Sequence, residues 1–251
     1  MTRAGGQQQD LSKREARAHR ILDAAASLIM RYGYNKTALD DIARAAAVAK
    51  GTLYLHWKSR EELFAALMIR EKAALTERFR QSVLADPEGP TLRSMMRHAA
   101  LALINTPLLK AELVRNLDVI GKLAHGDLGH GAHPERVTVF KVYLELLREH
   151  GLVRTDLSMR AQTYAVSAIF MGFFLVAPLM PDELKLSDEE LAEMLAETVH
   201  RTLEPGSISP AQLQAASEAF RQYVNRSAEF VQERLQEALH THSAQKEETS
   251  K

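Results

Sequence analysis

The stretch AKGTLYLHWKS, residues 49–59, combines cationic and hydrogen-bonding side chains with very few apolar ones. Leu53 and Trp57, four residues apart, and Val48 just upstream are typical of one face of a short helix that packs onto a scaffold. The side chains left to point outward as a set are Lys50, Gly51, Thr52, Tyr54, Leu55, His56 and Lys58. Cations and hydroxyl groups gathered on one helix face suit contacts with phosphates and with the edges of bases.

The predicted contacts divide by chemistry. Lys50, at the start of the helix, can reach a base edge or a phosphate in a major groove, and Gly51 allows a close approach of the backbone. Thr52 and Leu55 can meet the methyl group of thymine. We expect phosphate contacts from Tyr54, His56, Lys58 and, at the start of the preceding helix, Thr37.

Three helices are predicted to position these residues. The first carries a periodic apolar face and ends at Gly33, where a left-handed residue stops a helix most easily. Its inward residues are Ile21, Leu22, Ala25, Leu28, Ile29 and Tyr32. Thr37 followed by Asp40 resembles a capping box, so we expect Thr37 to cap a short second helix. That helix is predicted to bury Leu39, Ile42, Ala43 and Ala46.

A tight turn at Ala47 and Val48 leads to the third helix, which Val48, Leu53 and Trp57 anchor. Ser59 is predicted to cap the next helix. The inward residues of that helix are Leu63, Phe64, Leu67 and Met68. Short second and third helices joined by a tight turn have the spacing of a helix-turn-helix.

Residues 14–74 resemble the DNA-binding domain of the TetR family of transcriptional regulators. The resemblance is carried by Thr37, LDDIARAA at 39–46, Val48 and KGTLYLHWKSREEL at 50–63. It implies an all-α fold, with an N-terminal three-helix helix-turn-helix domain followed by an all-helical effector-binding and dimerisation domain. It also implies a cytoplasmic homodimeric repressor that binds a palindromic double-stranded DNA operator and is released by a small-molecule effector. No cofactor is expected.

Three positions depart from the family pattern. Ala47 and Ala49 stand where glycine and serine are common, and Leu55 stands where the residue is often polar or aromatic. Loss of a serine cap costs on the order of 1 kcal/mol. We therefore expect a slightly strained turn and a third helix that is less firmly formed in advance, and the base preference at Leu55 is open.

Composition and charge narrow the class of protein. The 251 residues include no cysteine, which excludes disulfides, a cysteine nucleophile and thiolate metal sites. The N-terminus has no apolar stretch typical of a signal peptide. Residues 1–60 contain 11 Lys/Arg and 5 Asp/Glu, a net +6, and the remainder is −6. A basic first quarter on an acidic remainder favours a polyanionic partner at one end, although a solvated charged face gives the same asymmetry.

Stretches with glycine and proline, which interrupt helices, divide the chain into five predicted segments. We expect a disordered arm at 1–13, the DNA-binding domain at 14–74 with its motif at about 38–57, and a ligand-binding and dimerisation domain at 75–205. An additional amphipathic helix follows at 206–240, and a disordered tail at 241–251. Apolar residues from Leu213 to Leu239 recur at helical spacing, and the added helix can cover the ligand domain or extend a dimer contact.

The resemblance extends to the second domain only in architecture. It implies that helices around 160–180 and 187–203 pack against the same two helices of a second copy, forming a four-helix interface. The apolar residues proposed to line an effector pocket are Met96, Leu117, Phe140, Tyr143 and Phe170. Ordinary core packing is the better interpretation of any one of them taken alone.

A glycine-rich loop carries His125, Asp127, His130 and His133, which are residue types that bind divalent metals. Their spacing matches no firm metal template, so no metal site is predicted and a solvated loop is the preferred interpretation. The three histidines remain weak candidates.

The apolar run Ala165 to Met180 has 16 residues. That is fewer than the roughly 20 that span a bilayer. We expect it to be buried between helices or subunits, with no membrane.

No phosphate-binding glycine loop, nucleophile elbow or HExxH helix is present, and an enzyme is not predicted. The alternative is a helical protein without a DNA role, such as a small-molecule or metal-binding module or an unrecognised enzyme.

Overall fold

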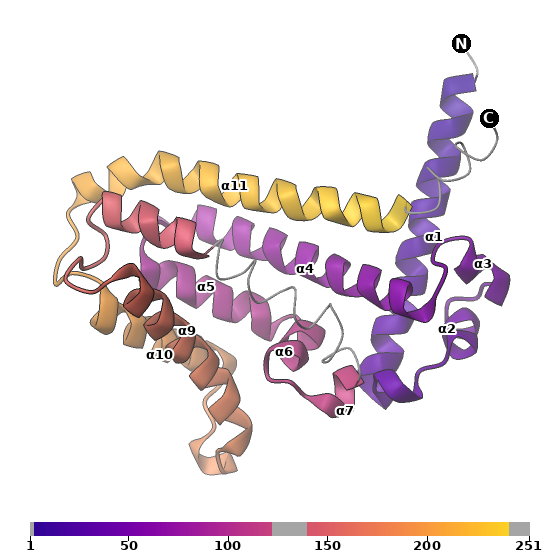
Figure 1. Cartoon of the computed structure of the whole chain (residues 1–251), viewed down its shortest axis with the longest axis horizontal. Coiled ribbons are helices and arrows are strands. Elements are labelled where there is room, and N and C mark those ends of the chain that lie inside the picture. The colour runs from indigo at the N-terminus through magenta and orange to yellow at the C-terminus, as the bar shows by residue number, and fades with distance from the viewer. Residues whose placement is uncertain (1–2, 122–139, 241–251) are drawn as a thin grey trace.

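The computed structural model describes residues 3–121 and 140–240, and within these ranges every regular element is a helix. The N-terminal part consists of α1 (Arg3–Tyr32), the short 3₁₀ turn η1 (Tyr34–Lys36), α2 (Leu39–Ala45), α3 (Lys50–Tyr54) and the start of α4 (Arg60–Ala85). Figure 1 shows the small α2 and α3 beside α1, at one end of the long α4. The predicted all-α fold class is confirmed.

Apolar faces of these helices meet in one cluster, which we call the N-terminal core. Its largest fully buried members are Ile21, Leu22, Ile29, Ile42, Leu53, Leu63, Phe64 and Leu67. Tyr32 was predicted to point inward but is 48% exposed, whereas Tyr34 is 5% exposed and takes the interior place. Gly33, at φ 80°, reverses the chain direction after α1 and turns the next aromatic side chain inward.

The first helix is longer than the sequence suggested. A disordered arm was expected over residues 1–13, but α1 already begins at Arg3. Apart from Gly5 and Gly6, this segment contains mostly Ala, Gln, Leu, Lys and Arg, which have high helix propensity. The periodic helix that follows therefore extends back through it, because adding turns to an existing helix is easier than starting one.

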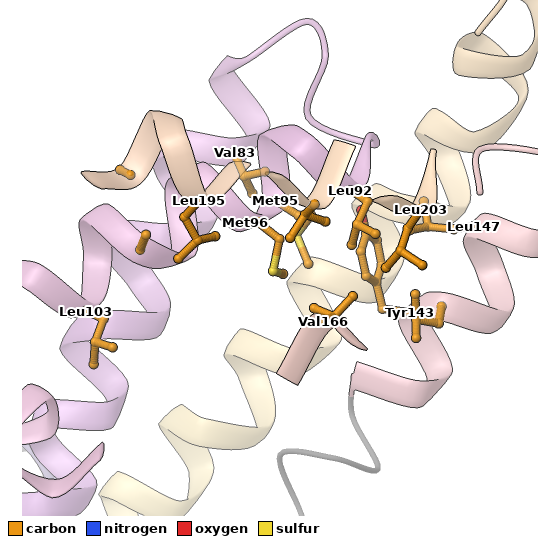
Figure 2. Close-up of a cluster of buried hydrophobic side chains, with 14 of the residues drawn as sticks. Val83, Leu92, Met95, Met96, Leu103, Tyr143, Leu147, Val166, Leu195 and Leu203 are labelled. Atoms are coloured by element: carbon orange, nitrogen blue, oxygen red, sulfur yellow. The ribbon is translucent and has the colours of Figure 1, made fainter. Parts of the chain in front are cut away.

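The central part packs around a second cluster, the central core. It is built from the end of α4 and from α5 (Leu92–Ile104), α6 (Pro107–Leu113), the helical residues 140–149, α9 (Met159–Val176) and α10 (Asp188–Leu203). The short α7 (Leu117–Ile120) follows α6, and the 3₁₀ turns η3 (Ala177–Leu179) and η4 (Asp182–Leu184) separate α9 from α10. Figure 2 shows this core, in which Tyr143 lies among Leu92, Leu147 and Leu203.

The two cores share helix α4. Ala73 belongs to the N-terminal core, and Leu75 packs against the central core. A last helix, α11 (Pro210–His240), packs along α4 for much of its length (Figure 1). A continuous helix therefore passes from one core to the other, and a second helix accompanies it.

The apolar segment near residue 170 is longer in the structure than its sequence suggested. Helical turns run without a break from Met159 to Leu179, 21 residues with a mean hydropathy of 1.5, which is long enough to cross a bilayer by length and composition alone. The count of 16 apolar residues therefore did not decide whether the segment is long enough to cross a bilayer. Only 17% of the residues in its most apolar window are fully buried within the chain, and the others are half-buried or exposed.

Candidate nucleic-acid interface

Helices α2 and α3 form a corner held by buried apolar side chains. Ile42 from α2 and Leu53 from α3 are 0% and 1% exposed, and Trp57 is 2% exposed. The backbone N–H of Val48 donates to the carbonyl of Ala43 at 3.0 Å and closes the end of α2. This packing fixes the angle between the two helices and determines which face of α3 points outward.

The turn between the helices stores strain. Ala47 adopts φ 53°, in the left-handed region. A Cβ atom in that region is unfavourable by roughly 1–2 kcal/mol. Ala49 precedes α3, and no side chain caps that helix. Both features agree with the expectation drawn from the missing glycine and serine. Ser59, in contrast, caps α4 as predicted, since its Oγ accepts the N–H of Glu62 at 3.1 Å.

The outward face of α3 carries most of the predicted contact residues. Lys50, Gly51 and Lys58 are exposed, Thr52 is half-buried, and Tyr54 and Leu55 are 44% and 59% exposed. A Cβ atom added at Gly51 would meet nothing within 4 Å. The protein's own packing therefore does not require glycine there, and the space above it is open to a partner.

Lys50 already has an acidic neighbour on this face. Its Nζ lies 3.0 Å from Oδ1 of Asp40, which is in the first turn of α2. The hydrogen bond to Asp40 raises the pKa of Lys50 above its ordinary value. Both side chains are more than half exposed, so the pair is screened by solvent and can open when a stronger anion approaches.

Two predicted phosphate ligands lie inside the protein instead. Thr37 is 2% exposed, and its hydroxyl donates to the carbonyl of Gly33 at 2.8 Å. It does not cap α2, because Ala38 occupies the N-cap position. In this conformation Thr37 closes the turn after α1 and offers no surface to a duplex.

His56 is the second of these buried residues. Its side chain is 1% exposed and lies against Trp57, with the ring centroids 5.2 Å apart. Burial, together with the charges of Arg14 and Arg17, lowers the pKa of His56 from 6.5 to about 4. The imidazole is therefore neutral at pH 7 and supports the corner from within, without the positive charge that a phosphate contact would use.

Arg14, from α1, is a residue that the sequence analysis missed. Its guanidinium donates to the carbonyl of Leu55 at 3.2 Å, at the end of α3. A cation is favourable at that end of a helix. The basic run SKREARAHR gave a signal of charge, but only the fold brings it beside α3.

Four of the five proposed pocket residues belong to the central core or pack against it. Met96 and Tyr143 are 5% and 0% exposed within the central core (Figure 2). The Tyr143 hydroxyl donates to the carbonyls of Pro90 and Thr91 at 3.1 and 3.2 Å. Phe140 and Phe170 are partly buried against the same core, whereas Leu117 begins α7, which packs near α1 and η1. Four of the five residues therefore share one core, and the fifth lies elsewhere.

A cleft of about 300 Å³ lies in a different place, where α1, α4 and α6 meet. It is lined by Ala26, Ser27, Met30, Glu71, Pro107 and Leu108.

The weak metal candidates His125, His130 and His133, with Asp127, fall outside the described residues. Among the residues that are described, no group of three metal-binding side chains comes together.

Comparison with known proteins agrees with this geometry. The model of bacterial regulatory proteins of the tetR family matches residues 21–67, which contain α2, α3 and the exposed contact face. The A-factor receptor protein of Streptomyces griseus is 29% identical over 194 residues, covering 75% of this chain and 64% of that protein. The transcriptional regulator YvkB of Bacillus subtilis is 28% identical over 165 residues, covering 62% of this chain and 80% of the relative.

The fold has solved counterparts. The structure of SmeT, the repressor of a Stenotrophomonas maltophilia multidrug efflux pump, superposes with a TM-score of 0.59. It is 18% identical and covers 77% of this chain and 93% of SmeT, a likeness that concerns the fold alone. The family model and the related regulators lead to one conclusion: the helix-turn-helix part of the chain, residues 21–67, belongs to the tetR family of bacterial regulatory proteins.

Proposed function

We propose that the protein is a homodimeric repressor that binds a palindromic operator through α3 and leaves it when a small molecule binds the central part of the chain. The observation that carries this proposal is the outward face of α3. There Lys50, Gly51, Tyr54 and Leu55 are exposed, while Leu53 and Trp57 behind them are buried. A rigid support with an exposed cation and hydroxyl is what major-groove recognition requires.

The exposed surface of α9 supports the homodimer. Tyr164, Ala168 and Leu175 lie on its outward side at helical spacing, and Tyr164 is 77% exposed. Nearby, Leu179 and Leu184 are 75% and 64% exposed, beside the charged Asp182 and Lys185. A bilayer would strip water from those charges, whereas a second copy covers the apolar stripe and leaves the charges at its rim. We therefore assign this surface to dimerisation and the protein to the cytoplasm, with its DNA.

The effector proposal rests on coupling between two sites. The relative from Streptomyces griseus is named a receptor protein, and the central core here contains aromatic and methionine side chains. Such side chains suit an apolar ligand. A ligand that binds better to the state with misplaced DNA-binding helices must weaken DNA affinity, since the coupling is reciprocal. We propose that Met96, Phe140, Tyr143 and Phe170 separate to admit such a ligand.

The test begins with selection of duplexes from a random library by the full-length protein. The selected sites should be roughly palindromic, because a two-fold dimer presents two copies of α3. Tyr54→Phe removes only a hydroxyl, so binding should weaken similarly for all operator variants. If Lys50 touches a base, Lys50→Ala should relax discrimination at one position by about 1–3 kcal/mol. If it touches only phosphate, the salt slope should fall by about one unit.

The matched control is Lys141→Ala, which removes an exposed lysine of the central part that pairs with Glu145 at 3.5 Å. It should leave DNA binding unchanged. If Lys50→Ala and Tyr54→Phe together leave both specific affinity and its salt dependence unchanged in a folded protein, α3 is not the reading element and the proposal is wrong.

A further inference from the structure

Helix α11 is anchored in both cores, although it is the last helix of the described chain. Near its start, Phe220 and Val224 are each 2% exposed within the central core. The ring of Tyr143 lies 6.0 Å from that of Phe220 and stacks on that of Tyr223 at 5.4 Å. The first half of α11 is therefore part of the central core.

The middle of α11 follows α4. Arg80 of α4 donates to Oδ1 of Asn225 at 3.4 Å, and Ala228 is 7% exposed. Glu229 and Phe230 lie on the opposite, exposed side. This section bridges the two cores without taking part in the α2–α3 corner.

The end of α11 belongs to the N-terminal core. Leu235 and Leu239 are 7% and 3% exposed among its side chains. The indole N–H of Trp57 donates to the carbonyl of Ala238 at 3.3 Å, across 181 residues of sequence. Trp57 also packs behind α3, so the final turns of α11 touch the residue that holds the exposed helix in place.

These contacts have a mechanical consequence. Besides α4, the short helices α6 and α7 join the two parts: both contact α1, and Leu108 of α6 belongs to the N-terminal core. These contacts lie close to α1 and leave the far side of α4 to α11, which has 31 residues. At that size α11 is roughly 45 Å long, and because it is fixed at both ends it restricts bending and twisting of the N-terminal helices about α4. We propose that α11 is a brace that holds the N-terminal helices in one orientation on the central part, and so sets the half-site spacing that the dimer accepts. This proposal rests on the proposed DNA-binding function.

In this arrangement Leu235, Leu239 and the backbone of Ala238 are positioning residues that act through Trp57 and make no contact with DNA. Their effect is on the relative placement of two reading helices, because half-site spacing mirrors the geometry of the dimer. Binding to an isolated half-site involves one reading helix and does not depend on the brace.

The first experiment softens the brace without touching either anchor. The double variant Glu229→Gly/Phe230→Gly places two glycines in the exposed middle of α11, and Glu229→Ala/Phe230→Ala is the matched control that removes the same side chains but favours helix. Affinity is measured for the selected operator, for the same half-sites moved apart by one and by two base pairs, and for a single half-site.

We expect the wild type and the alanine control to prefer the native spacing at least tenfold. The glycine variant should accept all three spacings within about threefold, with single half-site affinity unchanged. A glycine variant that discriminates between spacings as sharply as the wild type overturns the proposal. A wild type that selects no duplex overturns the proposed function and the spacing role with it, so the two failures are distinguishable.

A second experiment needs no DNA, because Trp57 is the only tryptophan of the chain. Leu235→Ala/Leu239→Ala weakens the anchor beside it, and Phe230→Ala, an exposed apolar residue on the same helix, is the control. The anchor variant should shift tryptophan emission to the red and increase quenching by acrylamide while the helical circular dichroism is kept. Unchanged emission and quenching would show that the end of α11 does not cover Trp57, and would overturn the proposal. If the anchor variant loses its helical circular dichroism, the proposal is tested by comparing Glu229→Gly/Phe230→Gly with Glu229→Ala/Phe230→Ala.

Discussion

Lys50 and Asp40 form an ion pair of 3.0 Å on the face that we propose meets DNA, joining the start of α3 to the first turn of α2. Both side chains are more than half exposed, so the pair contributes little to folding. Near a duplex it has a different effect, since Asp40 competes with phosphate for Lys50 and repels the backbone.

Replacement of Asp40 by asparagine should therefore tighten DNA binding. We expect a gain of about fivefold in affinity at low salt that shrinks as the salt concentration rises. Asp41→Asn is the control, because Asp41 lies in the same turn but pairs with Arg44 at 3.2 Å. Titration of labelled operator at several salt concentrations measures both. Equal effects of the two changes would mean that only net charge matters and that the pair has no special role.

Ala47→Gly should stabilise the N-terminal helices. The residue at this position has φ 53°. Glycine removes the cost of that conformation but adds entropy to the unfolded chain, which leaves a net gain of about 0.5–1 kcal/mol. Ala46→Gly, one residue earlier at φ −80°, should instead destabilise. Urea unfolding followed by Trp57 emission gives both values, and a loss of stability in Ala47→Gly contradicts the strain argument.

Ala49→Ser should supply the missing cap of α3. Its hydroxyl can accept a free N–H in the first turn, and we expect a gain of about 1 kcal/mol. Ala45 is exposed at the last position of α2, so Ala45→Ser should cost no more than about 0.7 kcal/mol. Amide hydrogen exchange across residues 50–55 is the most direct measurement, and α3 amides that exchange as fast as in the wild type would count against the prediction.

Acid should weaken the N-terminal core through His56. Its pKa falls from 6.5 to about 4 on folding, so between these values the unfolded chain binds a proton that the folded chain does not. Stability is then fully present above the unfolded pKa and is lost as the pH falls toward the folded pKa, by up to about 3 kcal/mol. Urea midpoints of Trp57 emission at pH 7.5, 6 and 5 should fall more steeply in the wild type than in His56→Gln. Parallel slopes would show that other groups carry the acid sensitivity.

Tyr164→Arg should dissociate the dimer that we propose. The side chain is 77% exposed on the apolar stripe of α9, and an unpaired charge in its place would be buried by the second copy. We expect the dimer dissociation constant to rise by about tenfold or more, at a cost of about 1.4 kcal/mol or more. Phe230→Arg, on α11 and 54% exposed, is the control and should remain dimeric. Sedimentation at micromolar concentration separates the outcomes, and a Tyr164→Arg dimer as tight as the wild type would place the interface elsewhere.

The sequence alone determined the features that depend on neighbours in the chain. Helical spacing of apolar residues predicted the helices and the buried faces of α2 and α4, because such a face must be covered. Ser59 was recognisable as a cap, since capping involves residues three positions apart. The departures at Ala47 and Ala49 were visible for the same reason, and the strain and the missing cap lie where they predicted.

Only the tertiary structure decided which polar residues of the motif are available. Thr37 and His56 were predicted to face DNA from their place in the motif, yet Thr37 turns back to Gly33, and His56 lies inside beside Trp57. Helical spacing orders side chains around one axis, but burial depends on what else packs there. The contact of Trp57 with Ala238 is the extreme case, because the two partners lie 181 residues apart in the sequence. Helix α11 was predictable as an amphipathic helix, but no local pattern encodes which surface such a face will cover.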